Sequence, residues 1–387
     1  MNTPLPRPDA AALAASAAAS RHIAGEIAAR GGWMPFSRFM ELALYAPGLG
    51  YYSGGAQKFG AAGDFITAPE LTPLFATSLA TQATQIMAES AAEIIEVGAG
   101  SGVLAAELLL ALEAVDALPS RYRILELSAE LQERQRQTLA GRAPHLAARV
   151  EWLDRLPQSF AGLVLANEVL DAMPVALVSW TAAGILERGV SGAENDENRT
   201  FSWEDRPAQA AVLAAAQALG VEAPYLSEIG LAAAAWIAEW GRIMTRGALL
   251  LIDYGYAQRE YYHPQRSRGT LLCHYRHHHH EDPLWLPGLN DITAHVDFTA
   301  IASAAHDAGL ELLGYASQAQ FLLNCGITEH LGKLLGQGDR IYLTASRAVA
   351  KLISPEEMGE QFKVMALGRG IAPALTGFSQ GDRCHTL

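Results

Sequence analysis

Three polar side chains follow an apolar segment near the middle of the chain, and their types and spacing suggest chemistry on a cation. The motif ANEVLDAMPV places Asn167, Glu168 and Asp171 directly after the apolar residues 162–166. A carboxylate beside apolar walls is costly unless it manages a cation or a proton. Paired carboxylates match the planar fork of a guanidinium through charge-assisted hydrogen bonds. We therefore predict that Glu168 and Asp171 bind a cationic group of the substrate and that Asn167 orients the cofactor.

The same acids allow a plainer interpretation, in which one carboxylate caps a following helix and the other faces solvent. In the functional interpretation, the carboxylates draw positive charge away from one guanidinium nitrogen, and this makes that nitrogen the better nucleophile. Catalysis would then depend mainly on positioning and electrostatics.

A glycine-rich segment, EIIEVGAGSG, indicates where a nucleotide-like cofactor binds. It leads from an apolar, β-branched strand candidate through Gly98, Gly100 and Gly102 into a helix candidate at 103–112. Glycine lets the chain turn tightly at the strand end, lets the backbone approach a ligand, and lets the helix pack close to the sheet. We therefore predict a cofactor loop at 98–102, which also includes Ala99 and Ser101.

The spacing of the glycines distinguishes two classes of cofactor. A dinucleotide fingerprint needs two residues between the second and third glycines, and this loop has one. Glu96 lies two positions before the first glycine and offers a carboxylate to an amino group. Glu126, beside Leu127, ends the next strand candidate and suits the two ribose hydroxyls. The glycine spacing and these two acids favour S-adenosylmethionine (SAM), with S-adenosylhomocysteine as product, over a dinucleotide. The remaining alternative is a loop built only for packing.

A long irregular segment at 45–70, rich in glycine, proline and aromatic residues, is typical of a binding loop or lid. Asp64, Phe65 and Thr67 lie just before a helix that starts near Pro69, and we expect them on the cofactor side. A loop packed only for stability is the alternative.

Helix and strand candidates alternate after the glycine loop, which predicts an α/β fold with a doubly wound, mostly parallel sheet. In such sheets ligands bind beyond the carboxyl ends of the strands, and polar residues mark these ends at 96–102, 126–128, 167–171 and 253–256. Spacing does not give the strand order or the direction of the last strand. The expected organisation is a helical and loop cap at 1–90, a core at 91–370 with an antiparallel β/α insertion at 175–245 and a substrate-side loop at 255–297, and a tail at 371–387.

Composition excludes several classes of protein. The chain has 387 residues and a net charge of −13, which argues against broad nucleic-acid binding. The sequence contains no run of 18 apolar residues, so it predicts no transmembrane helix. The first twenty residues lack the pattern of a secretory signal. Three scattered cysteines indicate a reducing compartment. We therefore expect a bacterial-type cytoplasmic protein, or one of the mitochondrial matrix in a eukaryote.

Four consecutive histidines, His277 to His280, invite a metal hypothesis that we reject. They cannot all face one ion, and no pattern of a closed zinc site accompanies them. A surface loop explains them, and no metal is predicted.

Several segments together resemble a known family. The motifs GLGYYS, GDFITAPEL, EVGAGSG, ANEVLDAMPV, LLIDYG, LCHYRH through DITAHVDF, and FKVMALGRG occur in this order between about Phe36 and Gly370. They are similar to the MidA-like family of SAM-dependent methyltransferases. The resemblance implies a class I, Rossmann-like methyltransferase core. Mitochondrial members of the family methylate an arginine of a core subunit of respiratory complex I and support assembly of that complex.

The resemblance also implies roles for particular residues. Three motifs match the family: the SAM loop (Gly98, Gly100, Gly102), the GDFxTxPE motif (Asp64, Phe65, Thr67, Pro69) and the substrate-side NExxDAxP motif (Glu168, Asp171). The histidine run and the acidic residues 194–197 fall outside the pattern.

We expect a SAM-dependent protein-arginine N-methyltransferase that acts on a complex I subunit or a related protein. Two alternatives stay open: a small-molecule N- or O-methyltransferase, and a SAM-binding assembly factor without robust catalysis. Apolar faces near 231–240 belong either to the core or to a homodimer surface.

Overall fold

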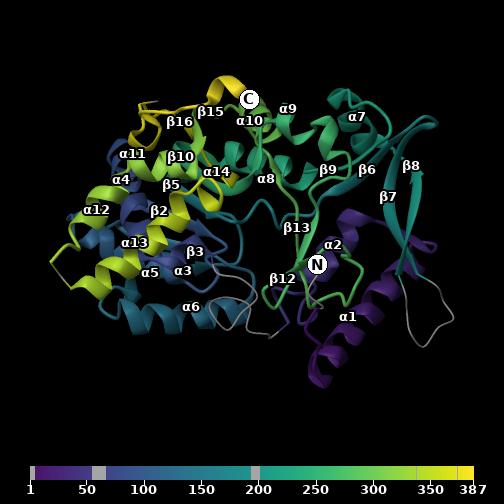
Figure 1. Cartoon of the computed structure of the whole chain (residues 1–387), viewed down its shortest axis with the longest axis horizontal. Helices are drawn as coiled ribbons and strands as arrows, with labels where there is room; N and C mark the ends of the chain where they lie inside the picture. Colours follow the sequence, from purple (N-terminus) through teal and green to yellow (C-terminus); the bar gives the residue numbers. More distant parts are fainter. Residues whose placement is uncertain (1–4, 55–66, 193–200, 337, 373) are drawn as a thin grey trace. The chain divides into compact units, whose positions relative to one another are not determined.

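The computed structural model describes residues 5–54, 67–192, 201–336, 338–372 and 374–387 (Figure 1). The chain forms two compact units. Unit 1 comprises Met1–Phe65, Asp171–Ala235 and Gln258–Asp297, and unit 2 comprises Ile66–Leu170, Trp236–Ala257 and Phe298–Leu387. Each unit is therefore discontinuous, unlike the consecutive ranges expected from the sequence. Residues 66–90, expected in the cap, belong to unit 2 because the helix that they contain buries its apolar side chains in the core of unit 2.

The sheet of unit 2 has the strand order β15-β16-β10-β5-β2-β3-β4. Neighbouring strands from β10 to β4 are parallel, whereas β16 is antiparallel to both β10 and β15. This arrangement confirms the predicted doubly wound α/β core and gives the direction of the last strand. The strands are β2 (Glu93–Val97), β3 (Arg121–Leu125), β4 (Val150–Leu153), β5 (Phe160–Asn167), β10 (Met244–Tyr256), β15 (Glu311–Ser317) and β16 (Phe362–Arg369).

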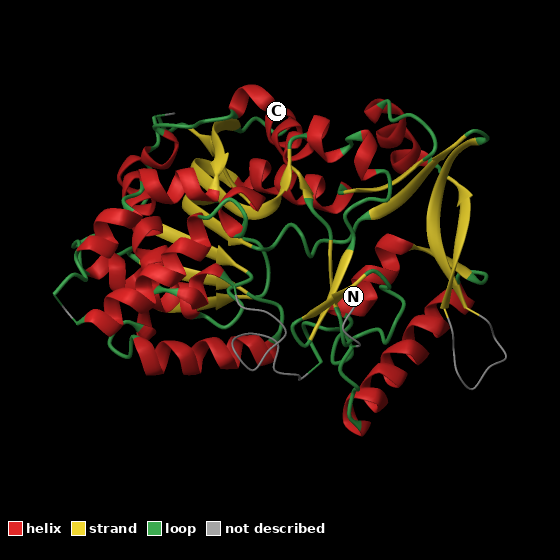
Figure 2. Cartoon of the chain, in the orientation of Figure 1, coloured by secondary structure: helices red, strands yellow, loops and turns green. Residues whose placement is uncertain are grey.

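Helices surround the strands of unit 2 (Figure 2). On β10, Leu250 and Ile252 belong to a core cluster with residues of the helices α4 and α5. Leu249 and Leu251 alternate with them and are equally buried, so both faces of the strand are covered, as parallel sheets require. The helices named in unit 2 are α3 (Ala68–Leu71), α4 (Pro73–Glu89), α5 (Val103–Glu113), α6 (Ala129–Arg142), α10 (Phe298–Asp307), α11 (Gln318–Asn324), α12 (Ile327–Gly332), α13 (Asp339–Ile353) and α14 (Met358–Gln361), and α8 (Leu231–Ile243) contributes its second half.

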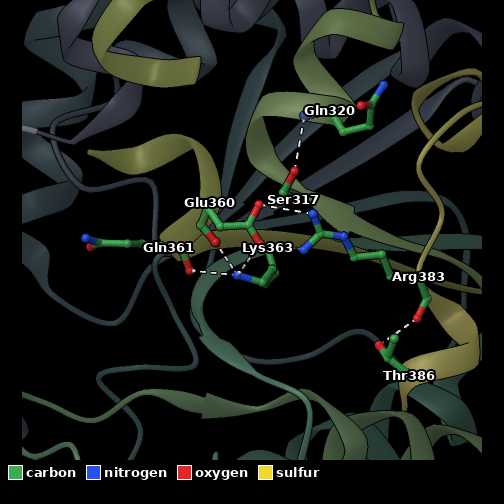
Figure 3. Close-up of polar contacts among 7 residues, drawn as sticks. All are labelled: Ser317, Gln320, Glu360, Gln361, Lys363, Arg383 and Thr386. Atoms are coloured by element: carbon green, nitrogen blue, oxygen red, sulfur yellow. Dashed lines mark hydrogen bonds and ion pairs between the residues drawn. The ribbon is translucent and has the colours of Figure 1, made fainter. Parts of the chain in front are cut away.

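The segment after β16 is integrated into unit 2. Phe378 is buried, and its ring centroid lies 5.3 Å from that of Phe321. The guanidinium of Arg383 forms a two-pronged ion pair with Glu360, and the ammonium of Lys363 donates to the main-chain oxygen of Glu360 (Figure 3). Burial and ion pairing therefore hold the end of the chain against the core.

Unit 1 begins with α1 (Ala10–Ala29), β1 (Trp33–Pro35) and α2 (Phe36–Tyr45). Its larger sheet has the order β1-β7-β6-β9, and β8 pairs with β7. The pairs β6–β7, β7–β8 and β6–β9 are antiparallel, which confirms the predicted antiparallel insertion. The elements of the insertion are β6 (Ala176–Thr181), β7 (Gly184–Gly192), β8 (Phe201–Pro207), α7 (Ala210–Leu219) and β9 (Tyr225–Ile229).

A smaller sheet with the order β12-β11-β13 also belongs to unit 1, and α9 (Gln258–Tyr261) precedes it. The prediction that the four histidines form an irregular loop is wrong, because His278–His280 are a strand, β12, which forms an antiparallel hairpin with β11 (Leu272–Tyr275). The strand β13 (Asp291–Thr293) pairs with the other edge of β11. Arg276 and His277 form the turn with left-handed backbone angles. The hairpin pairs His274 with His279, a register that spacing alone does not show.

Within the described residues, no group of three or more histidines, cysteines and acids is placed to hold a metal ion. The same part of the chain contains no helix with the length and apolarity needed to cross a membrane.

Candidate functional site

The glycine loop joins β2 to α5 through three left-handed residues. Gly98, Gly100 and Gly102 have φ angles of 62°, 52° and 79°, which side chains with a Cβ rarely adopt. A Cβ at Gly98 would lie 3.3 Å from the Val169 side chain, and one at Gly102 would lie 3.0 Å from the Cα of Gln135. Gly102 thus permits close packing against α6, whereas the glycine pattern predicted the sheet as its neighbour.

Ser101 connects the loop to the upstream motif. Its hydroxyl donates to the Glu70 carboxylate at 2.9 Å, and Glu70 belongs to the short helix α3 that follows Thr67. Asp64 and Phe65 lie outside the described residues. Glu70 was not among the predicted site residues, and its place inside the GDFITAPEL motif was the available signal.

Glu96 lies in β2, two residues before the glycine loop, and is only 2% exposed. The hydroxyl of Tyr122 donates to its carboxylate at 2.6 Å. Burial raises the pKa of Glu96 to about 7, the hydrogen bond from Tyr122 opposes this rise, and the nearby Glu126 adds to it. The role predicted for Glu96 toward the cofactor amino group stays a prediction, and its carboxylate already has a partner in Tyr122.

Glu126 marks the carboxyl end of β3. Its carboxylate accepts from the Ser128 N–H at 2.9 Å and from the Gln135 amide at 3.0 Å, so both partners fix its orientation. Next to it, Leu127 is 78% exposed, which is unusual for so large an apolar side chain. An ordered acid and an exposed apolar side chain together offer polar and apolar contacts to a ligand.

A surface hollow of about 580 Å³ lies beyond β4 and is lined by residues 152–158. The Glu126 N–H donates to the Leu153 carbonyl at 3.2 Å, so the hollow adjoins the end of β3. The Trp152 indole donates to Gln135 at 2.9 Å and is thereby held in place. No unusual residue type marks the lining of this hollow, so the sequence does not predict it.

The motif after β5 holds Glu168 in an unusual conformation. Its φ angle is +54°, and its N–H donates to the Ile252 carbonyl of β10 at 2.8 Å. The Asn167 amide donates to the Glu168 carboxylate at 3.0 Å. The Asn167 side-chain oxygen is buried and has no hydrogen-bond partner among the described residues. The structure therefore holds the Glu168 carboxylate beside the Asn167 amide at the carboxyl edge of the sheet, and the roles that the motif predicts for them stay predictions.

Asp171 is the first residue of the second segment of unit 1, whereas Glu168 belongs to unit 2. The Asp171 carbonyl accepts from the Ala294 N–H at 3.0 Å, and Tyr52 donates to Asp291 at 2.8 Å. Burial raises the pKa of Tyr52, and the charges of Asp291 and Asp171 raise it further, which places both acids near this phenol. Asp171 thus lies in an acid and tyrosine cluster of unit 1.

The alternative in which one of these acids caps a helix is wrong. After Asp171 the chain passes through turns and enters β6 at Ala176 without forming a helix. Neither acid therefore has a helix terminus to satisfy.

Known proteins similar to this chain include a methyltransferase family, curated relatives and a solved structure. Residues 74–316 match the family model Methyltransf_28, which describes S-adenosyl-L-methionine-dependent methyltransferases. The mitochondrial protein arginine methyltransferase NDUFAF7 of Danio rerio is 29% identical over 379 residues, which cover 90% of this chain and 86% of that protein. The NDUFAF7 homolog of Drosophila melanogaster is 27% identical, with 97% and 90% of the two chains covered.

A solved structure is more similar still. A COG1565 superfamily member from Burkholderia thailandensis, crystallised with S-adenosyl-homocysteine, is 52% identical and superposes with a TM-score of 0.95. The match covers 99% of this chain and all of that one. The predicted family and cofactor are thereby confirmed. The chain belongs to the MidA-like (COG1565) family of class I methyltransferases, and its cofactor is SAM.

Proposed function

We propose that this methyltransferase transfers the methyl group of SAM to an arginine nitrogen of a protein substrate. The observation that carries the proposal is the Glu168 carboxylate, which is partly exposed and held at the carboxyl edge of the sheet by Asn167. The names of the NDUFAF7 relatives, protein arginine methyltransferases, support the same acceptor.

Several residues suit the cofactor, and we propose that they hold it. Three of the five residues from Gly98 to Gly102 are glycines, so backbone without side chains can approach a ligand there, and the ordered carboxylate of Glu126 suits the ribose hydroxyls. The exposed Leu127 and the hollow at 152–158 suit the adenine end. Glu96, Thr67, Asp64 and Phe65 complete the proposed cofactor set, and Asn167 would orient the cofactor beside the acceptor.

The bound cofactor supplies an electrophilic methyl group on a sulfonium. The Glu168 carboxylate accepts hydrogen bonds from the acceptor guanidinium and raises electron density on the attacking nitrogen. The bond from nitrogen to methyl forms as the bond from sulfur to methyl breaks, and the attacking nitrogen then loses one proton to the carboxylate or to water. Asp171 is proposed as a second acid for the same cationic substrate.

The partner that the family resemblance suggests is a core subunit of respiratory complex I or a related protein. The net charge of −13 favours a basic partner segment. The cytoplasm is the location that we propose for a bacterial-type protein of this family.

The test uses purified protein, SAM with a tritiated methyl group, and a recombinant complex I core subunit. We expect label on the subunit and methylarginine by mass spectrometry. Gly100→Val should abolish both this transfer and calorimetric binding of S-adenosylhomocysteine, while thermal unfolding stays cooperative, because a side chain at φ 52° distorts the loop. Label on lysine or only on small molecules would contradict the proposal, as would tight cofactor binding without transfer to any protein.

A further inference from the structure

The turn after β5 is held by a carboxylate of the neighbouring strand. The N–H groups of Val169 and Leu170 both donate to Oδ2 of Asp253, at 3.2 and 2.9 Å. The other oxygen of Asp253 accepts from the N–H of Tyr254 at 2.9 Å. Asp253 lies in β10 and is only 1% exposed. Both of its oxygens therefore serve backbone donors.

The turn after β5 needs a hydrogen-bond acceptor for the N–H groups of Val169 and Leu170. The left-handed angle of Glu168 is unfavourable for a residue with a Cβ, so other contacts must hold it. Successive N–H groups on such a turn converge on one point and favour an anion there. The Asp253 carboxylate occupies that point, and the adjacent pairing of Ile252 with Asn167 keeps the two strands in register.

We infer that Asp253 is a positioning residue that sets the backbone conformation of Glu168 and so aims the Glu168 carboxylate at the methyl acceptor. The inference rests on the function proposed above. Asp253 contacts the backbone of the turn, so it acts through Glu168. Its loss should lower the rate of methyl transfer while cofactor affinity stays intact, because the glycine loop has main-chain hydrogen bonds of its own, from the Gly98 N–H to the Leu125 carbonyl at 3.1 Å and from the Gly102 N–H to the Ala99 carbonyl at 2.8 Å.

The test compares Asp253→Asn with the matched control Asp382→Asn. Asp382 also accepts backbone N–H groups through both oxygens, from Tyr315 at 3.4 Å and from Cys384 at 2.8 Å, at the C-terminal segment. In either variant an NH₂ group replaces one acceptor oxygen. We expect Asp253→Asn to lower kcat at least 30-fold with less than threefold change in the Kd of S-adenosylhomocysteine, and Asp382→Asn to change kcat less than threefold.

Two further measurements separate positioning from a general loss of stability. Amide hydrogen exchange at Val169 and Leu170 should accelerate at least tenfold in Asp253→Asn and stay unchanged in Asp382→Asn. The double variant Glu168→Gln with Asp253→Asn should lose no more kcat than Glu168→Gln alone, since both changes act on one group.

The inference is overturned if Asp253→Asn keeps kcat within threefold of wild type, or if the two single losses multiply in the double variant. A wild-type protein that methylates no protein acceptor would overturn the proposed function, and the positioning role with it. In that case, faster amide exchange at Val169 and Leu170 in Asp253→Asn would show that Asp253 only stabilises the turn. Failure of the proposed function is thus distinguished from failure of the positioning role, in which the wild type methylates protein but Asp253→Asn keeps its kcat.

Discussion

Two strand ends in this chain carry acids that look alike in the sequence and differ in the structure. At the end of β9 in unit 1, Glu228 is 2% exposed and accepts from the N–H groups of Thr270 and Leu271, both at 3.0 Å, and from the Tyr261 hydroxyl at 3.1 Å. At the end of β5 in unit 2, Glu168 stays partly exposed and accepts from Asn167. Burial and the supply of donors therefore separate a structural acid from one available to a substrate.

The largest effect that we predict is on stability, from Glu228→Gln. In the variant one of the two acceptor oxygens becomes an NH₂ group and the negative charge is lost, so the donors around this buried side chain share a single neutral acceptor oxygen. We expect the free energy of unfolding at pH 7 to fall by about 4 kcal/mol, measured by urea denaturation. The exposed Glu222→Gln serves as control, with a change below about 0.5 kcal/mol. If Glu228→Gln lowered the free energy of unfolding by less than about 1 kcal/mol, Glu228 would not be a structural acid and would not differ from Glu168 in this respect.

The converse prediction concerns Glu168→Gln. The variant keeps an oxygen for Asn167 but loses the negative charge, so kcat should fall about 100-fold, or about 2.7 kcal/mol of activation free energy. The melting temperature and the Kd of S-adenosylhomocysteine should stay at wild-type values. Steady-state kinetics and calorimetry measure these quantities. Undiminished kcat would remove Glu168 from the reaction, and a large stability loss would make it a second structural acid.

A smaller effect on the free energy of unfolding is expected at Glu96. This acid is buried like Glu228 but has Tyr122 as its hydrogen-bonding partner. Because its pKa is raised from 4.5 to about 7, the folded state binds more protons than the unfolded state in this range. The stability that protonated Glu96 contributes is complete below about pH 4.5 and is lost as the pH rises through about 7. Glu96→Gln should therefore be more stable than wild type at pH 8.

The expected difference at pH 8 is about 2 kcal/mol, below the roughly 3 kcal/mol that the full shift allows, since relaxation around a buried charge reduces its cost. The two proteins should differ least near pH 4.5. Denaturation curves across this range measure the effect, with the exposed Glu356→Gln as control. Equal slopes of stability against pH in Glu96→Gln and wild type would show that Glu96 does not titrate as its burial implies.

The sequence was sufficient for features that depend on local pattern. The glycine loop and the strands β2 and β5 follow from residue types and periodicity, because backbone conformation and burial leave local marks. The role of Asp253 was not predictable from spacing, since its partner Val169 lies 84 positions away. The contact of Glu70 with Ser101 spans 31 positions and was missed for the same reason.

The assignment of Glu168 and Asp171 to different units also escaped the sequence analysis. Three positions separate them, and their motif suggested one joint site. The division depends on which core each following segment joins: Leu170 belongs to unit 2, whereas Val175 and Leu177 are buried in the core of unit 1. Such partition between cores is a property of the whole chain.

The place of β16 has a consequence for how the protein is made. This strand pairs with β10 on one side and β15 on the other, although it is the last of the three in the chain. During synthesis, β10 and β15 therefore emerge before the strand that must lie between them. Each then presents an unpaired edge that other chains can pair with. A chain cut before Phe362 would keep those edges open, so aggregation or degradation is the expected fate of shortened forms.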